Sequence, residues 1–337
     1  MNISEYKGVY VFVEQREGEI QKVSLELLGK ARELADDINE KVIAVVLGHD
    51  IKNKLDELIY FGADEILYTD SDVLNVYTTE PYTKVISNII NEYKPEIFLF
   101  GATSIGRDLA PRISARIYTG LTADCTSLEI DKENNNNLLM TRPAFGGNIM
   151  ATIVCPDHRP QMSTVRPGVM KICERDENRL GKINEYKIDI SQDSLNIEVL
   201  EIVKEKKEKI NIEEANVLVS GGRGIGKPEN FKTLKELANL LEGQISASRA
   251  VVDAGWLERD HQVGQTGKTV RPNIYIACGI SGAIQHIAGM EESDYIIAIN
   301  KDSTAPIFET ADLGIVGDIN KIIPMVIDEV AATKEDK

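Results

Sequence analysis

The amino-acid sequence predicts two α/β domains, the first on a mostly parallel sheet with antiparallel additions and the second of Rossmann-like topology. Short apolar runs, typical of buried strands, alternate with stretches of helical periodicity, and this alternation occurs twice along the chain. Strands that are apolar on both faces are typical of parallel sheets covered by helices. With 337 residues the chain is long enough to bury two cores. We therefore expect a first domain at 1–203, a linker at 204–210 and a second domain at 211–337.

The first domain is expected to begin with a regular alternation of strands and helices. We expect strands at 9–13, 42–48, 65–68 and 97–101, and helices at 23–38, up to about 60 and at 82–93. From 121 to 203 the apolar segments are shorter and more extended, which predicts the antiparallel additions. The mixed-charge run at 204–209 has almost no apolar content, which favours a linker over a basic patch.

The second domain restarts the same alternation. We expect strands at 216–220, 274–278 and 296–300, a short strand before 247, a further strand from 313, and helices at 231–241, through 286 and from 319 to about 330. The loop after the first of these strands contains Gly221, Gly226 and Lys227 at the spacing of a phosphate-binding P-loop. Pro228 stands where the magnesium-binding Ser or Thr is required, and Lys227 stands where a dinucleotide fingerprint needs its third glycine. An ATPase and a standard nicotinamide site are both disfavoured.

Composition excludes several classes of function. The 54 acidic and 38 basic residues give a net charge of −16, which argues against a nucleic-acid partner. Four cysteines without a C-x-x-C pair suggest neither a zinc site nor an iron–sulfur cluster. No apolar run approaches about 18 residues and no basic, apolar leader opens the chain, so we expect no membrane insertion and a cytoplasmic protein.

Glycines and small polar residues collect where strands of the second domain end, at 221–224, 248–255, 262–267, 279–286, 300–302 and 317–318. Glycines let backbone N–H groups approach a ligand, and sparse polar groups fix its orientation. An Arg in the first of these loops suits a pyrophosphate, and a carboxylate at a strand end suits a ribose hydroxyl. The pattern predicts a site for a large, flat, anionic cofactor.

Together with 101–108 in the first half, these stretches resemble the alpha subunit of the electron transfer flavoproteins over nearly the whole chain. The resemblance implies that the second domain binds FAD. It places Arg249 facing the flavin ring, Thr266 against the flavin N5 position and His286 as a donor to the flavin O2 carbonyl, where a positive charge or donor favours the reduced, anionic flavin. The cofactor-binding residues expected are Arg223, Ser248, Arg249, Gln262, Val263, Gly264, Gln265, Thr266, Gly279, Ser281, Gly282, Ala283, Gln285, His286, Asn300 and Asp318.

Other interpretations of single residues stay open. Arg249 alone suits a surface ion pair, Thr266 a turn hydroxyl and His286 ordinary packing. Asn300 and Asp318 are assigned by the resemblance to the adenosine half of FAD, although helix capping also suits an Asp there and is favoured for Asp302.

Residues 101–112 are the most site-like stretch of the first half. A strand end leads through Thr103 and Ser104 into a helix that carries Arg107, Asp108 and Arg112. A small-anion site is conceivable at such a strand end. We favour helix capping by Thr103 or Ser104, with the three charged residues in structural or interface ion pairs.

The resemblance implies an electron carrier rather than an enzyme with a substrate of its own. It implies a heterodimer with a beta subunit, and transfer between acyl-CoA-type or other flavin dehydrogenases and further acceptors. Some members of the family take part in flavin-based electron bifurcation, and the chain alone does not decide this. Two alternatives stay open: a stand-alone flavin or nicotinamide oxidoreductase, and a nucleotide-binding protein without redox chemistry.

Overall fold

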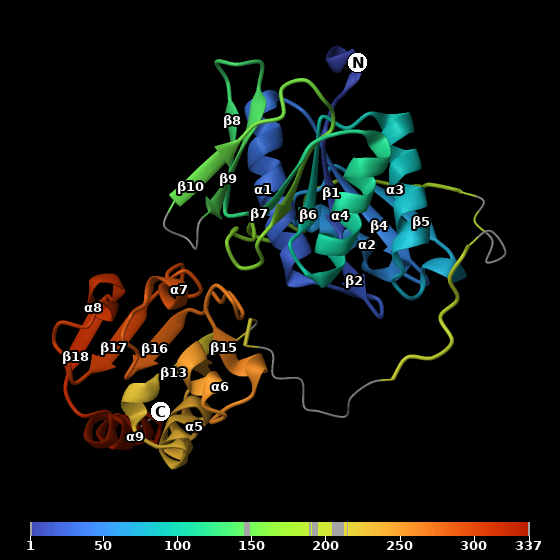
Figure 1. Ribbon diagram of the computed structural model, residues 1–337. Helices are drawn as coiled ribbons and strands as arrows, with labels where there is room; N and C mark the ends of the chain where they lie inside the picture. The colour runs from blue at the N-terminus through green and yellow to red at the C-terminus, as the bar shows by residue number, and fades with distance from the viewer. Residues whose placement is uncertain are drawn as a thin grey trace. The chain divides into compact units, whose positions relative to one another are not determined.

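The computed structural model describes residues 2–144, 149–188, 190, 195–203, 212–213 and 215–335. The chain divides into two compact units, the first at Met1–Lys204 and the second at Glu205–Lys337. Figure 1 shows that each unit carries its own sheet with helices packed against it. The expected linker at 204–210 lies outside the described residues, and each unit is described separately below.

Seven described strands of the first unit form one parallel sheet in the order β12-β5-β4-β1-β6-β11-β7. Their bounds are Val9–Val13 (β1), Val42–Gly48 (β4), Glu65–Asp70 (β5), Ile97–Gly101 (β6), Leu121–Cys125 (β7), Gln161–Val165 (β11) and Lys182–Glu185 (β12). The chain progresses outward from β1 through β4 to β5 and then returns to β6 on the other side of β1. The strand order therefore reverses between β1 and β6.

Both faces of this sheet are covered, as continuous apolar strands require. Val9, Val11 and Val13 pack on the side of α1 (Lys22–Ile38) and α2 (Leu55–Tyr60). Tyr10 and Phe12 pack on the opposite side, with α3 (Thr79–Tyr93) and α4 (Ser104–Ile117). The alternation along β1 follows from the strand period of two.

Antiparallel additions occur where the sequence predicts them, though not in every strand of that region. A three-stranded antiparallel sheet has the order β10-β9-β8, with bounds Ser127–Asp131 (β8), Asn137–Ala144 (β9) and Ile149–Ile153 (β10). A small hairpin that the sequence does not predict, outside 121–203, pairs β2 (Gln15–Arg16) with β3 (Glu19–Ile20). The strands β7, β11 and β12 instead join the parallel sheet, and β11 inserts between β6 and β7.

The second unit has the Rossmann-like topology that the sequence predicts. Six described strands form a parallel sheet in the order β15-β14-β13-β16-β17-β18. Their bounds are Val217–Gly221 (β13), Gln244–Ser248 (β14), Gln262–Val263 (β15), Ile274–Cys278 (β16), Ile296–Asn300 (β17) and Leu313–Val316 (β18). The first three strands progress to one side of β13 and the last three to the other, which is the doubly wound order of dinucleotide-binding folds. The strand order reverses between β13 and β16.

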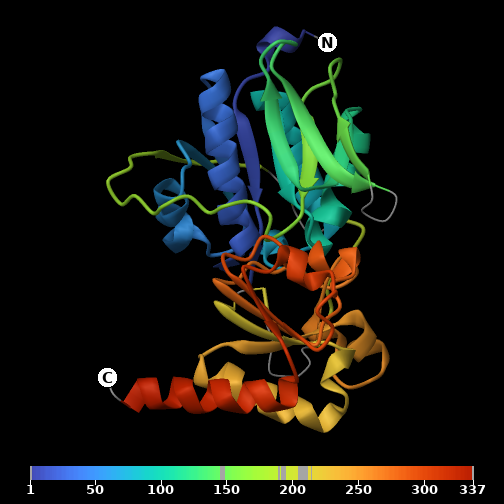
Figure 2. The same cartoon turned by 90° about the vertical axis from the view of Figure 1, so that its left-hand side faces the viewer.

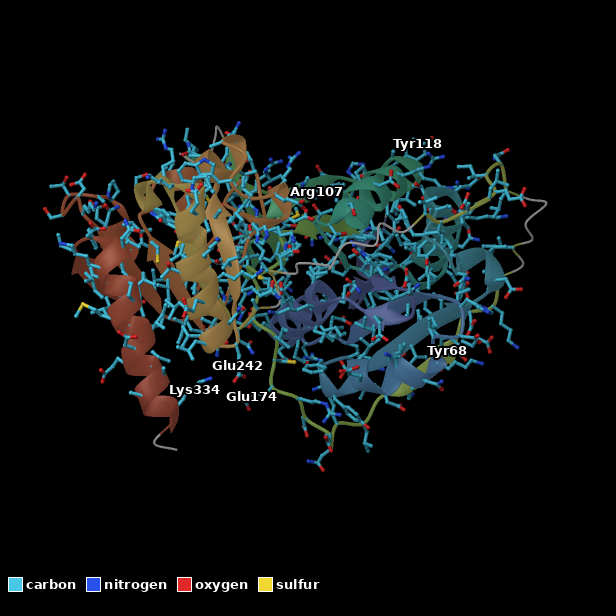
Figure 3. The ribbon with its side chains drawn as sticks, turned by 90° about the horizontal axis from the view of Figure 1, so that it is seen from below. Tyr68, Arg107, Tyr118, Glu174, Glu242 and Lys334 are labelled. Atoms are coloured by element: carbon cyan, nitrogen blue, oxygen red, sulfur yellow. The ribbon has the colours of Figure 1, made fainter. Side chains whose placement is uncertain are left out.

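Two apolar clusters hold this sheet to its helices. One joins α5 (Phe231–Leu240), α6 (Arg249–Asp253) and α9 (Ile319–Glu335) to one face, and the other contains Ile307 of α8 (Ile307–Thr310). Figure 2 shows α9, in red, beside α5 on that shared face. The helix α9 continues beyond the expected end near 330, and Lys334 pairs with Glu242 at 3.3 Å (Figure 3). No helix among the described residues combines the length and apolarity needed to cross a bilayer.

Candidate functional site

A cavity of about 660 Å³ lies at the carboxyl edge of the second sheet. Its wall is built from residues that follow β13, β14, β15, β16 and β17, so it straddles the point between β13 and β16 where the strand order reverses. Ligands of open α/β sheets bind at this place because the loops on either side diverge there. The volume is in the usual range of about 300–1,000 Å³ for ligand sites.

Glycines bring the two central loops of the cavity into direct backbone contact. The Gly224 N–H donates to the Gly279 carbonyl at 3.0 Å, and the Gly222 N–H donates to the Cys278 carbonyl at 2.8 Å. A Cβ atom added at Gly222 would lie 2.2 Å from the Gly279 oxygen. Gly279 itself has φ +63°, a conformation that favours glycine. Arg223 stands between the two loop glycines and lines the cavity.

The end of β14 contributes Ser248 and Arg249, which both line the cavity. Ser248 ends the strand and Arg249 is the first residue of α6. The side chain of Arg249 is exposed and pairs with Asp253, which lies one turn further along α6 and also lines the cavity. Arg249 therefore makes the surface ion pair that the sequence left open and also lines the cavity.

The loop after β15 is fixed by backbone hydrogen bonds. The cavity is lined by both residues of β15, Gln262 and Val263, and by Gly264 and Thr266 of the loop. The Gln262 side-chain amide donates to the Thr266 hydroxyl at 3.0 Å, which orients that hydroxyl. Gln265 is the exception among the predicted residues here: it is outside the lining residues, and its N–H donates to the Gln285 carbonyl at 2.7 Å. Gln265 thus ties this loop to the neighbouring one.

The loop after β16 supplies Gly279, Ser281, Ala283, Gln285 and His286 to the cavity wall. The expected helix through His286 is a single turn, α7 (Ile284–Ile287), of 4 residues. Because α7 has only 4 residues, its helix dipole is small. The N–H groups of His286 and Ile287 both donate to the Ala283 carbonyl. Gly282 lies outside the lining residues; with φ +89° and Ile307 N 2.2 Å from its would-be Cβ, it allows this loop to approach α8.

His286 is almost fully buried, with 7 % of its surface exposed. Its Nε2 lies 3.0 Å from the hydroxyl of Tyr275, and its Nδ1 is buried, with no well-aligned hydrogen bond to a described residue other than the approach of the Val263 backbone. Burial lowers the pKa of His286 to about 4, an effect that the backbone of Val263 partly offsets. The imidazole is therefore neutral at pH 7 and carries one ring proton.

The last predicted residues follow β17 and β18. Asn300 lines the cavity, and its side-chain amide donates to the Ile280 carbonyl at 2.9 Å. Asp318 is outside the lining residues; it accepts from the N–H of Asn320 at 3.0 Å at the start of α9 and pairs with Lys301. Asp302 lines the cavity, and its carboxylate accepts from the Thr304 N–H in a turn before α8. The helix capping that the sequence favours for Asp302 is therefore not observed, since Pro306 is the N-cap of α8.

The cavity also contains residues outside the predicted set: Gly222, Gly224, Ala250, Asp253, Ile280, Asp302, Ala305 and Pro306. The two glycines belong to the recognised glycine-rich loop. Asp253 stands four residues after Arg249, the spacing of a helical ion pair, and this signal could have identified it. Ala305 and Pro306 reach the cavity through the fold alone and have no local signal.

The donor set fits an elongated anionic cofactor. Arg223 and Arg249 supply positive charge to the cavity wall, and the glycine loops bring backbone groups to it. The cavity therefore has the size and the positive charge that such a cofactor needs.

In the first unit, Thr103 caps α4 as expected, accepting from the Gly106 N–H at 3.1 Å. Asp108 accepts hydrogen bonds from the hydroxyls of Tyr77 and Thr79. Arg107 donates to Asp124 at 3.3 Å (Figure 3 labels Arg107), and Arg112 is exposed. Arg107 and Asp108 are thus engaged within the first unit, as the structural interpretation expects.

One group of possible metal ligands also occurs among the described residues of the first unit. His49, Asp50 and Asp70 have ligand atoms within 4.8 Å of one another, at the carboxyl ends of β4 and β5. Asp50 is exposed, and exposed acidic groups are common without a metal, so we assign no metal to it.

Comparison with known proteins identifies the family of both units. Residues 9–191 match the family model described as "Electron transfer flavoprotein domain", and residues 211–291 match "Electron transfer flavoprotein FAD-binding domain". The chain is 58 % identical to "Electron transfer flavoprotein subunit alpha" of Thermoanaerobacterium thermosaccharolyticum over 332 residues, which covers 98 % of this chain and 100 % of the relative.

Two more distant relatives carry other names. "Acryloyl-CoA reductase electron transfer subunit beta" of Anaerotignum propionicum is 46 % identical and covers 100 % of this chain and 98 % of the relative. "Lactate dehydrogenase (NAD(+),ferredoxin) subunit LctC" of Acetobacterium woodii is 42 % identical and covers 99 % of this chain and 79 % of the relative. The chain belongs to the electron transfer flavoprotein family, in which it resembles alpha subunits, and its second unit contains the FAD-binding domain of that family.

Proposed function

We propose that the cavity of the second unit is the FAD site of an electron-carrying alpha subunit that has no organic substrate of its own. The observation that carries the proposal is the wall of this cavity, where Arg249, Thr266 and His286 meet from segments that follow β14, β15 and β16, beside the reversal of the strand order. The same part of the chain matches the FAD-binding family model. Bound FAD would supply the one- and two-electron chemistry, and the protein binds, orients and tunes it.

The surroundings of the glycine loops, the two arginines and His286 support a role for each of them in FAD binding. The loops of Gly222, Gly224 and Gly279 permit close approach of a pyrophosphate, and Arg223 suits its charge. Arg249 holds a positive charge at the rim. Neutral His286 adds no further positive charge to those of Arg223 and Arg249.

Thr266 and Asn300 are oriented by neighbours before any ligand arrives. The Thr266 hydroxyl accepts from Gln262, which leaves its own hydrogen free to be donated into the cavity. Asn300 donates to Ile280 and accepts from the Asp302 N–H, so its amide is held in one orientation. We propose Thr266 for the reactive edge of the flavin and Asn300 for the adenosine half. The proposed FAD contacts from the cavity wall also include Ser248, Val263, Gly264, Ser281, Ala283 and Gln285. We also propose three FAD-binding residues that do not line the cavity, namely Gln265, Gly282 and Asp318.

The proposal includes a beta subunit as a heterodimer partner and a cytoplasmic location. Support for the partner comes from the relatives, which are named as subunits. The name of one relative links it to acryloyl-CoA reductase and that of another to an NAD⁺- and ferredoxin-dependent lactate dehydrogenase. We propose an acyl-CoA-type or other flavin dehydrogenase as the electron donor or acceptor, within a simple carrier or a bifurcating complex.

The visible spectrum of the purified chain, with and without the beta subunit, tests the function. We expect a flavin absorbance in both preparations and one FAD released from the chain on denaturation. A stand-alone oxidoreductase would instead turn over NAD(P)H and a small substrate without the beta subunit. A colourless chain that binds AMP or ATP and no FAD would establish a nucleotide-binding protein and overturn the proposal.

A further inference from the structure

Gln262 and Thr266 meet at the two ends of one short loop in the cavity wall. Both residues line the cavity, and the Gln262 side-chain nitrogen lies 3.0 Å from the Thr266 hydroxyl oxygen. They differ in burial, because Gln262 is the first residue of β15 and only 5 % exposed, whereas Thr266 is exposed. Thr266 therefore presents the larger surface to a ligand, and Gln262 lies behind it.

The chemistry of the two groups determines the direction of this hydrogen bond. An amide nitrogen only donates, whereas a hydroxyl can both accept and donate. The Thr266 oxygen therefore accepts from Gln262, and its own hydrogen is directed elsewhere. Among the described residues this hydroxyl donates to no acceptor, so its hydrogen is available to a ligand in the cavity.

The backbone of the loop holds the contact in place. The Lys268 N–H donates to the Gln262 carbonyl at 2.8 Å, and the Gly264 N–H donates to the Lys268 carbonyl at 3.0 Å, so the loop closes on itself. A Cβ atom added at Gly267 would lie 2.9 Å from Cγ of Gln262, so this glycine lets the Gln262 side chain pack against the loop. The contact is therefore part of the fold of the loop and exists before a ligand binds.

We propose that Gln262 is a positioning residue that holds the Thr266 hydroxyl as a hydrogen-bond donor toward the cavity. This inference rests on the proposed function, because the acceptor it serves is an unprotonated atom at the reactive edge of the flavin. A hydroxyl held as a donor stabilises the reduced, anionic flavin, which presents acceptors at this edge. It disfavours a flavin protonated at the same atom, because two hydrogens would then face each other. Gln262 thus acts on the potential through Thr266.

The first measurement tests the direction of the contact in the FAD-free chain. NMR of a sample with ¹⁵N-labelled glutamine side chains should show one amide proton of Gln262 at low field relative to those of Gln244, an exposed residue at the start of β14. Gln262→Glu assigns the signal by removing it. In Thr266→Val, which removes the hydroxyl and retains the shape of the side chain, the shift should be lost. An amide that meets Thr266 through its oxygen would show no shift in the unsubstituted chain and would overturn the proposal.

The second measurement is a double-mutant cycle on the first-electron potential of bound FAD, in the complex with the beta subunit. In Gln262→Glu the ionised carboxylate can only accept, so the Thr266 hydroxyl must donate to it and no longer to the flavin. The added charge also lowers the potential, and Thr266→Val separates the two effects because it removes only the first.

The fall in potential caused by Gln262→Glu should be larger in the unsubstituted background than in the Thr266→Val background. The expected difference is the equivalent of about tenfold in the reduction equilibrium, or about 59 mV for one electron, which the strength of one hydrogen bond allows. Equal falls in the two backgrounds would mean that only the charge acts, and the proposal would be overturned.

Two further variants make the result specific. Gln262→Met has neither the donor nor a charge, and it should lower the potential in part, and only where Thr266 is retained. It also provides the test if Gln262→Glu does not fold. Gln244→Glu makes the same change of charge at a residue outside the cavity wall and should leave the potential unchanged. A fall in Gln244→Glu as large as that in Gln262→Glu would assign the effect to net charge and overturn the proposal.

The two measurements distinguish this proposal from the proposed function. If the unsubstituted chain binds no FAD, the proposed function fails, and the amide signal of the same chain still decides whether Gln262 donates to Thr266. If the amide shift is present and the cycle shows no coupling, Gln262 orients Thr266 without acting on the flavin. That result would overturn the part of the proposal that concerns the flavin.

Discussion

Arg249 and Asp253 face each other one turn apart on α6, with Arg249 Nε 3.2 Å from Asp253 Oδ2. Their side chains are 66 % and 63 % exposed, and both residues line the cavity of the second unit. An exposed ion pair at this helical spacing contributes only about 0.3–0.5 kcal/mol. Arg249 can therefore exchange Asp253 for an anionic ligand at little cost, and Asp253 limits how much positive charge the ligand experiences.

The first prediction concerns this pair. Arg249→Ala should lower the first-electron potential of bound FAD, because it removes a positive charge that stabilises the reduced, anionic flavin. A hydrogen bond to a charged group is worth about 1.5–3 kcal/mol, which corresponds to roughly 60–130 mV for one electron. Asp253→Asn should shift the potential in the opposite direction. Potentiometric titration at equal FAD content measures both, and equal potentials in all three proteins would exclude Arg249 from this role.

The second prediction concerns acid stability. The pKa of His286 is lowered to about 4 by burial, whereas an unfolded histidine titrates near 6.5. Between these two values the unfolded state binds a proton that the folded state does not, so the free energy of unfolding falls as pH decreases. The loss should reach about 3 kcal/mol by pH 4.

Trp256 reports on this change locally. It is the only tryptophan of the chain, and it packs on the apolar cluster of the second unit. Urea unfolding of the FAD-free chain, followed by tryptophan fluorescence from pH 7.5 to 4.5, should show the decrease. His286→Gln should flatten the dependence, and His158→Gln, in the first unit, should not. An equally steep decrease without His286 would assign the acid sensitivity to other groups.

Strand ends could be predicted from the sequence because their signals are local. The apolar run 274–278 followed by a glycine predicts both β16 and the turn at Gly279, and the same reasoning places Asn300 at the end of β17. Most of the predicted cofactor set therefore meets at one cavity, since parallel strands present their carboxyl ends at one edge.

Features that depend on non-local packing could not be predicted in this way. The sequence of β11 is that of an ordinary short extended segment, and nothing local in it indicates that it pairs with both β6 and β7 in the parallel sheet. Tyr275 has the sequence signature of a strand residue, and only the fold brings its hydroxyl to His286. Pro306 reaches the cavity because Gly282 allows its loop to pack against α8.

The third prediction tests the glycine contact at the cavity. In Gly224→Ala the added methyl group would lie 2.8 Å from the Gly279 carbonyl oxygen, so the two central loops must separate. Overpacking of this kind costs about 1–3 kcal/mol, and we expect FAD affinity to fall by at least about tenfold. Gly243→Ala is the matched control, because its methyl group would lie 2.4 Å from the Val217 carbonyl oxygen, away from the cavity wall.

Equilibrium dialysis with FAD and urea unfolding distinguish the two glycine variants. Both should lose stability, and only Gly224→Ala should lose affinity in the folded state. Equal losses of affinity would mean that FAD binding responds to the general stability of the second unit, and not to the contact between its loops.

The last prediction concerns the partner surface of the first unit. On α4, Asp108 is held by Tyr77 and Thr79 and Arg107 by Asp124, whereas Arg112 is exposed. Arg112 is attracted to Asp108, but among the described residues it makes no side-chain hydrogen bond that would have to break before it meets a carboxylate of the beta subunit. Arg112→Glu should therefore weaken the heterodimer by about tenfold, mainly through slower association that depends on ionic strength.

Lys235→Glu makes the same change of charge on an exposed residue of α5 in the second unit and serves as the control. Sedimentation of each purified variant with the beta subunit, at low and at high salt, measures the affinity. If both variants weaken the complex equally, the effect comes from the net charge of −16 rather than from α4. If neither does, the beta subunit binds elsewhere, and the charged residues of α4 have only the structural roles that their hydrogen bonds show.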